Sequence, residues 1–172
     1  MTLRHPGTER REKVWRFATC LVVVAAGFVL AGCSSAEQQV QPELIGPDKY
    51  QQEYETAVRN FPEPMPSNIS FPASPAPLKG LAEASVGEAQ AYFIWACAWQ
   101  DTLLNSDDPV AEKKAAEQIG NFSSTSWAEV HYQDPEGVWE KMAEKATLGD
   151  VSEVRASFDG DCIYYREARN GN

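Results

Sequence analysis

The stretch that decides the fold is Ala91-Tyr-Phe-Ile-Trp-Ala-Cys-Ala-Trp99, a run of consecutive apolar residues. Ser85 and Glu88 stand three residues apart just before it, which is the spacing of a capping box at a helix start. We therefore expect a helix from Ser85 to about Asn105. A helix that is apolar on every side is buried on most of its faces, and this run is too short to span a bilayer. The stretch predicts a central core helix.

Shorter segments with helical spacing of apolar residues lie on both sides of this helix. Most of them begin at an acidic or hydroxyl residue that can cap a helix. They are expected at 48–60, 109–119, 135–148 and 150–158, with one or two helical turns that start at a capping box of Ser126 and Glu129 and an extended stretch at 162–165. The sequence therefore predicts an all-α fold, a single small bundle of five to six helices over residues 47–166. A frayed tail is expected at 167–172.

The segment from Phe61 to Gly80 is rich in proline. Its prolines are Pro62, Pro64, Pro66, Pro72, Pro75 and Pro77. Neither a helix nor an inner strand tolerates this density, because proline lacks the backbone N–H. We expect an extended connector that wraps the domain. A ligand for the aromatic groove of another protein is the alternative. The expected contact points are Phe61, Met65, Ile69 and Phe71.

The amino terminus has the pattern of an export signal. A basic region precedes an apolar run, Cys20–Ala31, of signal-peptide length. The run ends in Leu30-Ala31-Gly32-Cys33, which resembles the lipobox of bacterial lipoproteins. The resemblance implies that residues 1–32 are removed and that Cys33 carries lipid. Residues 33–46 then read as a lipidated tether. The alternative is an ordinary signal peptide that ends near a cysteine.

This resemblance also implies a location and a class of host. A lipid on Cys33 would hold the chain at the outer face of the cytoplasmic membrane, in the extracytoplasmic space. If the host were Gram-negative, Ser34 would permit sorting to the outer membrane. The long basic region and the Trp95-to-Trp99 helix resemble small lipoproteins of high-GC Gram-positive (actinobacterial) bacteria. That resemblance covers few residues and implies no particular activity.

Four cysteines are present in the full chain. Cys20 would leave with the signal peptide and Cys33 would carry lipid, which leaves Cys97 and Cys162 in an oxidising compartment. We expect these two to form a disulfide that closes a loop of about 65 residues. Two free thiols, one of them reactive, are the alternative.

The charge of the chain is strongly asymmetric. Residues 33–172 contain ten basic and 23 acidic side chains, whereas residues 1–32 are net positive. Nucleic-acid binding that ignores sequence needs Lys and Arg to displace counterions, so the expected mature chain is unsuited to it. The same charge opposes electrostatic adhesion to anionic lipid. We expect no nucleic-acid partner.

The sequence contains no recognisable catalytic or metal-binding constellation. His131 is the single histidine after residue 32, and a zinc site normally needs several His or Cys ligands. The serines near His131 lack the turn that exposes a nucleophile. We therefore expect no metal, no cofactor and no enzymatic activity. An envelope hydrolase that uses a lone carboxylate is the weakest alternative.

Aromatic residues are the remaining candidates for binding. Trp95 and Trp99 are expected in the core, because they share one face of the central helix. Trp127, Tyr132 and Trp139 are candidate ligand-binding residues, although core packing is the favoured role for both of these tryptophans. The expected function is a lipid-anchored interaction module with an envelope protein or glycan as partner. A glycan-binding or small-ligand-binding lipoprotein that uses exposed aromatics is the alternative.

Overall fold

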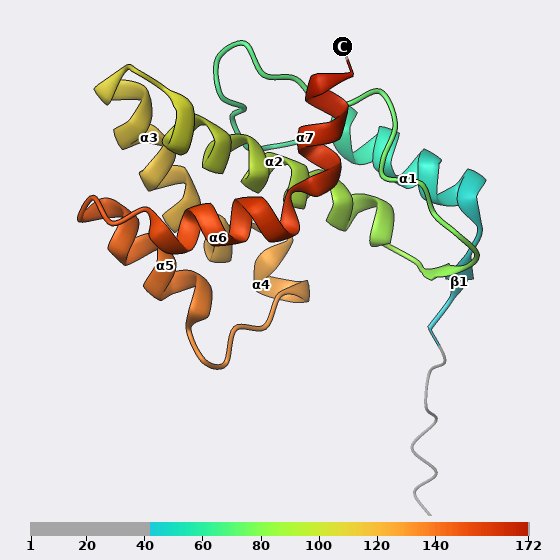
Figure 1. The fold of residues 1–172 in the computed structure, drawn as a ribbon. Coiled ribbons are helices and arrows are strands. Elements are labelled where there is room, and N and C mark those ends of the chain that lie inside the picture. Colours follow the sequence, from blue (N-terminus) through green and yellow to red (C-terminus); the bar gives the residue numbers. More distant parts are fainter. Residues whose placement is uncertain (1–41, 172) are drawn as a thin grey trace, which may run out of the picture. The chain divides into compact units, whose positions relative to one another are not determined.

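A computed structural model describes residues 42–171, which form an all-α bundle with a small two-stranded ribbon (Figure 1). Beyond the ribbon these residues contain seven α-helices and one 3-10 helix, η1. The helices are α1 (Pro47–Arg59), α2 (Val86–Asn105), α3 (Pro109–Gly120), η1 (Phe122–Ser124), α4 (Ala128–His131), α5 (Val138–Thr147), α6 (Ser152–Asp161) and α7 (Ile163–Asn170). The strands β1 (Leu44–Ile45) and β2 (Ala82–Glu83) pair antiparallel. The predicted fold class is confirmed.

Helix α2 is the centre of the bundle, as its apolar sequence predicts. It contacts α1, α3, α6 and α7, and both hydrophobic clusters of the core include it. One cluster joins Trp95 and Trp99 to α3, α4 and α5. The other joins Ile94 and Cys97 to α1, α6 and α7. Trp95 has no exposed surface, and Trp99 has 2%.

The start of α2 differs from the expected capping box. Ser85 has a φ of 75°, in the left-handed region, and its side chain makes no capping hydrogen bond. Instead Oε2 of Glu53, on α1, accepts from the backbone N–H of Ser85 at 3.0 Å and of Gly87 at 3.3 Å. A carboxylate from a neighbouring helix therefore satisfies the free N–H groups that begin α2.

Residues 61–80 form an extended segment along the bundle, which we name the proline strap. The carbonyl oxygen of Pro64 accepts from two indoles of α2, those of Trp95 at 2.8 Å and Trp99 at 3.1 Å. The spacing of four between the tryptophans places both N–H groups on the same side of the helix. The predicted contact points are half-buried against the core: Phe61, Met65, Ile69 and Phe71.

Tyrosines from two other helices also hold the strap. The hydroxyl of Tyr54, on α1, donates to the carbonyl of Pro72 at 2.8 Å. The hydroxyl of Tyr164, on α7, donates to the carbonyl of Ser74 at 2.7 Å. A proline-rich backbone offers many carbonyls and few N–H groups, so donors from side chains suit it. The prediction of an extended, wrapping connector is confirmed.

Three expected boundaries are wrong. The segment 162–165, expected to be extended, begins α7, and that helix continues to Asn170 through much of the expected tail. Helix α5 begins at Val138 rather than at 135, although Asp134 still accepts from its first N–H groups. The short helix α4 is preceded by Thr125, whose hydroxyl accepts from Ala128, so Ser126 is not its cap.

The last residues of the range 33–46, expected to be part of a tether, belong to the folded domain. Leu44 and Ile45 form β1, and Ile45 is only 2% exposed. The backbone N–H of Ala84 donates to the carbonyl of Glu43 at 2.8 Å, which extends the ribbon by one more contact. The helical domain therefore includes residues from Glu43 onward.

Candidate binding site

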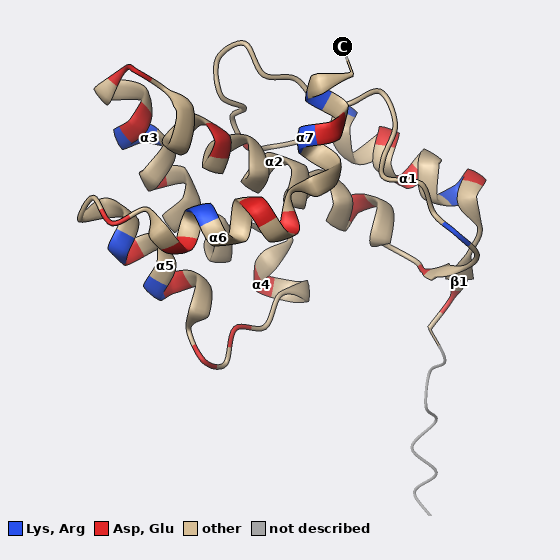
Figure 2. Ribbon diagram, viewed as in Figure 1, with Lys and Arg blue, Asp and Glu red and all other residues tan. Residues whose placement is uncertain are grey.

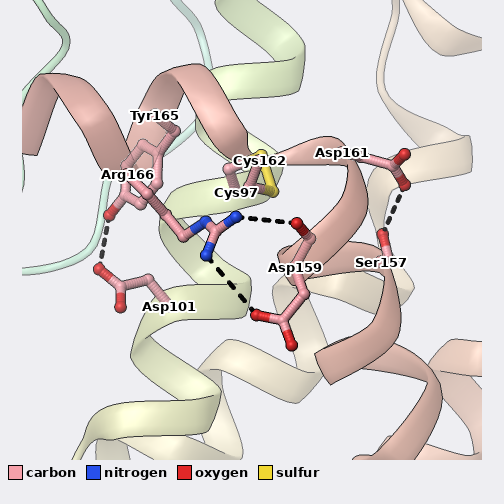
Figure 3. The surroundings of a disulfide bond; sticks show 8 residues. All are labelled: Cys97, Asp101, Ser157, Asp159, Asp161, Cys162, Tyr165 and Arg166. Atoms are coloured by element: carbon pink, nitrogen blue, oxygen red, sulfur yellow. Dashed lines mark hydrogen bonds and ion pairs between the residues drawn. A yellow bond between two sulfur atoms is a disulfide. The ribbon is translucent and has the colours of Figure 1, made fainter.

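The predicted disulfide joins Cys97, in the middle of α2, to Cys162, at the junction of α6 and α7 (Figure 3). Cys97 is 6% exposed and Cys162 is 1% exposed. The bond closes a loop of 65 residues and fixes the carboxy-terminal helices to the core. Because both sulfurs are buried, the bond is shielded from thiols in solution, and its role is structural.

A polar network lies one helical turn from the disulfide. Asp101, on α2, accepts from the hydroxyl of Tyr165 at 2.8 Å and pairs with the guanidinium of Arg169 at 3.1 Å (Figure 3 shows the first contact). Asn105 donates to the same carboxylate at 2.7 Å. Burial, then the hydrogen bond to Asp101, raises the pKa of Tyr165 well above its ordinary value. These contacts join α7 to the last turns of α2.

A groove of about 500 Å³ opens beside this network. Its walls come from the proline strap, the end of α2, the start of α3 and α7. The ammonium of Lys114 lies 5.5 Å from the centroid of the Trp99 ring at its edge. Amide, hydroxyl and charged groups of both signs share the lining, and they are Ser67, Asn68, Asp101, Thr102, Asn105, Ser106, Asp108, Lys114 and Arg169. The groove offers donors and acceptors to a small polar ligand.

Local structure explains why these side chains gather in the groove. Asp108 accepts from the N–H of Val110 at 2.9 Å and so begins α3, as predicted from its position before Pro109. Asn68 has a φ of 65°, which turns the strap at the rim of the groove. Asparagine adopts this left-handed conformation more readily than most residues.

The three aromatic residues predicted to bind a ligand pack mainly against the core. Trp127 is 8% exposed and stacks on Tyr92, with 5.4 Å between the ring centroids. Trp139 and Tyr132 are half-buried against Phe122, and the indole of Trp139 donates to the carbonyl of Ile119 at 2.7 Å. Their indole and phenol faces are therefore largely occupied by other side chains. They do not line the groove beside Asp101.

Two further residues considered in the sequence, Cys33 and His131, have not yet been placed. Cys33, the predicted lipidation site, lies outside the described residues. His131 is exposed at the end of α4, with its ring centroid 5.6 Å from that of Trp127.

In residues 42–171, no three His, Cys, Asp or Glu side chains are grouped so that they could hold one metal ion. Within the same range no helix is both long and apolar enough to cross a bilayer.

Sequence reasoning missed the groove because its residues are far apart along the chain. Asn68, Asp101, Lys114 and Arg169 belong to four different elements, and none stands in a recognisable motif. The only signal near them is the Asp108-Pro109 pair, which predicts a helix start and no ligand.

Buried tyrosines predict a loss of stability in alkali. Burial raises the pKa values of Tyr54 and Tyr165 well above the ordinary value, so the folded chain keeps protons that the unfolded chain releases. The stability that these two tyrosines contribute is complete below pH 10 and is lost as the pH rises further. Each tyrosine should reduce the free energy of unfolding by up to about 1.4 kcal/mol per pH unit there. Urea unfolding between pH 8 and 11.5 measures this slope.

Matched variants assign the alkaline slope to each residue. Tyr165→Phe and Tyr54→Phe should each flatten the slope above pH 10. At pH 8 Tyr54→Phe loses one hydrogen bond, about 1 kcal/mol, and Tyr165→Phe loses two, with Asp101 and Arg169, about 2 kcal/mol. Absorbance at 295 nm should show both phenols titrating only as the protein unfolds. Ionisation of these phenols in the folded chain near pH 10 would contradict the prediction.

Comparison with known proteins finds no family model that matches the chain, no similar curated protein and no similar solved structure.

Proposed function

We propose that this protein is a lipid-anchored, extracytoplasmic binding module. The sequence supports the anchor through Leu30-Ala31-Gly32-Cys33, which resembles a lipobox. The helical domain that follows would then act at the outer face of the cytoplasmic membrane. Its expected partner is a protein or glycan of the cell envelope, and the proposal includes no catalytic step.

The buried disulfide between Cys97 and Cys162 is the observation that carries this proposal. Structural disulfides form and persist in oxidising compartments and are rare in the cytosol. Pairing of these two cysteines leaves Cys33 as the remaining thiol after residue 32. The pairing thus supports both export and a dedicated use for Cys33.

Metabolic labelling with an alkyne-tagged fatty acid tests the anchor. Wild-type protein should incorporate the label and yield a mature chain whose first residue is acylated Cys33. Cys33→Ser should abolish labelling, whereas Ser35→Ala, two residues away, should label as wild type. Absence of label in the wild type, or label that persists in Cys33→Ser, would overturn the lipid anchor.

The groove beside Asp101 favours a second candidate function, the binding of a small polar ligand such as a glycan or peptide fragment. The specific observation is its mixed lining of amides, hydroxyls and charges around the covered edge of Trp99. A ligand that displaces the ammonium of Lys114 should change the emission of Trp99.

Titration with soluble cell-wall fragments, followed by tryptophan fluorescence, tests this second function. Wild-type protein should give a saturable change, and Lys114→Met should reduce or remove it. Lys113→Met is the matched control, because Lys113 is exposed on the same helix and does not line the groove. A flat wild-type titration, or equal responses from the two variants, would exclude ligand binding of this kind.

A further inference from the structure

Two leucines stand exposed on the ribbon at the start of the domain. Leu44, in β1, is 58% exposed, and Leu81, just before β2, is 66% exposed. Ile45, the second residue of β1, is 2% exposed and packs inward. The ribbon therefore has one face toward the core and an outer face on which the two leucines are exposed together with Glu83.

Strand register places both leucines on this outer face. Leu44 pairs with Glu83 and Ile45 pairs with Ala82. Successive side chains on a strand point to opposite faces, so Leu81 shares a face with Glu83 and hence with Leu44. Gly80, with a φ of 104° and open space around it, ends the strap just before Leu81. We name Leu44 and Leu81 the leucine tip.

The leucine tip lies where the described chain begins. Figure 1 shows β1 at the edge of the bundle, ahead of α1. Cys33 precedes Pro42 by nine residues, and a chain of that length spans at most about 30 Å. This reach is about the length of α2, whose 20 residues extend about 30 Å. A lipid on Cys33 would therefore hold the leucine tip close to the bilayer.

The charge of the domain limits how it can approach a membrane. Acidic side chains recur on nearly every helix (Figure 2), and the chain after residue 32 carries 23 acids against ten bases. Anionic headgroups repel such a surface, so a contact with lipid must rest on apolar side chains. Lys79 stands two residues before Leu81, and Lys49 pairs with Glu43 beside Leu44. Lysines of this kind extend their ammonium to the headgroups while their stems cover apolar surface.

We propose that the leucine tip inserts into the outer leaflet of the membrane to which the chain is anchored, and so orients the helical domain. This inference rests on the proposed lipid anchor. Two leucines bind a bilayer weakly by themselves, but a tether of nine residues makes their insertion an intramolecular event at high effective concentration. The occupant of the tip is thus phospholipid, and the far end of the bundle is directed away from the membrane.

Site-specific photocrosslinking of the full chain in cells tests the proposal. Leu81→benzoylphenylalanine and Leu44→benzoylphenylalanine should form adducts that add the mass of one phospholipid. Leu148 is 81% exposed and lies between α5 and α6, away from the ribbon, so Leu148→benzoylphenylalanine is the matched control. Adducts at the tip should exceed those at Leu148 at least about fivefold, because the tether favours one orientation.

The outcomes separate this inference from the anchor on which it rests. All three variants are first checked for the fatty-acid label on Cys33. If labelled protein forms equal lipid adducts at Leu81 and Leu148, or if Leu81 crosslinks to a protein instead of lipid, insertion of the leucine tip is overturned. Either result leaves the lipid anchor intact. Loss of the label in wild type overturns the anchor itself. Leu44→Gln and Leu81→Gln should fold normally, because both side chains are exposed.

Discussion

Replacing both cysteines of the disulfide, Cys97→Ala with Cys162→Ala, should lower the free energy of unfolding by about 4 kcal/mol. The bond closes a loop of 65 residues, and its loss returns that loop's freedom to the unfolded chain. The change is a large fraction of the stability of a domain of this size. Urea denaturation followed by tryptophan fluorescence measures it.

Reduction of the wild type provides the matched comparison. Wild-type protein unfolded and refolded in dithiothreitol should have the same midpoint as the double variant within about 1 kcal/mol. Both forms should keep native helix content at low temperature, where packing around α2 holds the helices together without the disulfide. A double variant that unfolds at the wild-type midpoint would show that the bond contributes little, and would remove the structural role assigned to it.

Gly87→Ala should destabilise the domain by about 3 kcal/mol. A Cβ at this position would lie 2.5 Å from the carbonyl oxygen of Tyr50 and 2.8 Å from the backbone nitrogen of Tyr54. Because both are backbone atoms of α1, the clash cannot be relieved by turning a side chain. The helices α1 and α2 would have to separate, which also weakens the contacts of Glu53 with the start of α2.

Gly160→Ala is the control for this substitution. Gly160 lies in α6 with open space around its missing Cβ, so alanine there should add about 0.5 kcal/mol of stability through its higher helix propensity. The midpoints of thermal unfolding of the two variants should therefore shift in opposite directions from that of the wild type. A Gly87→Ala protein as stable as the wild type would mean that the two helices do not cross closely at this point.

The elements that sequence predicts well are those fixed by local chemistry. The apolar stretch 91–99 predicts a buried helix because it is apolar on every side, and every residue of it except Phe93 is buried. Asp108 before Pro109 predicts the start of α3 because the cap and the fixed φ act within one turn. The proline content of 61–80 excludes helix and inner strand whatever the rest of the chain does.

The elements that sequence predicts badly depend on partners far along the chain. Ser85 and Glu88 match a capping box, but Glu53, 32 residues earlier, takes that role once α1 packs against α2. The segment 162–165 forms helix because Cys162 and Tyr165 dock on α2 through the disulfide and Asp101. No local pattern encodes either contact.

The candidate sites show the same contrast between features that the sequence predicts and features that depend on residues far apart along the chain. The pairing of Cys97 with Cys162 is predicted by counting the cysteines that remain if residues 30–33 are read as a lipobox, and the disulfide itself is present in the structure. The groove beside Asp101 and the leucine tip each bring together residues from separate elements. Leu44 falls in the range predicted as tether, because a strand of two residues has no detectable period.

The fastenings of the proline strap have a definite order in time. A chain is synthesised from its amino terminus, so the strap's donors appear in the order Tyr54, then Trp95 and Trp99, and last Tyr164. Before the last helix is made, Tyr54 and the two indoles of α2 can already hold the strap at Pro72 and Pro64, and only the contact at Ser74 is missing. Cleavage beside Ser74 rather than beside Pro64 would therefore mark chains whose carboxy-terminal helix has not docked.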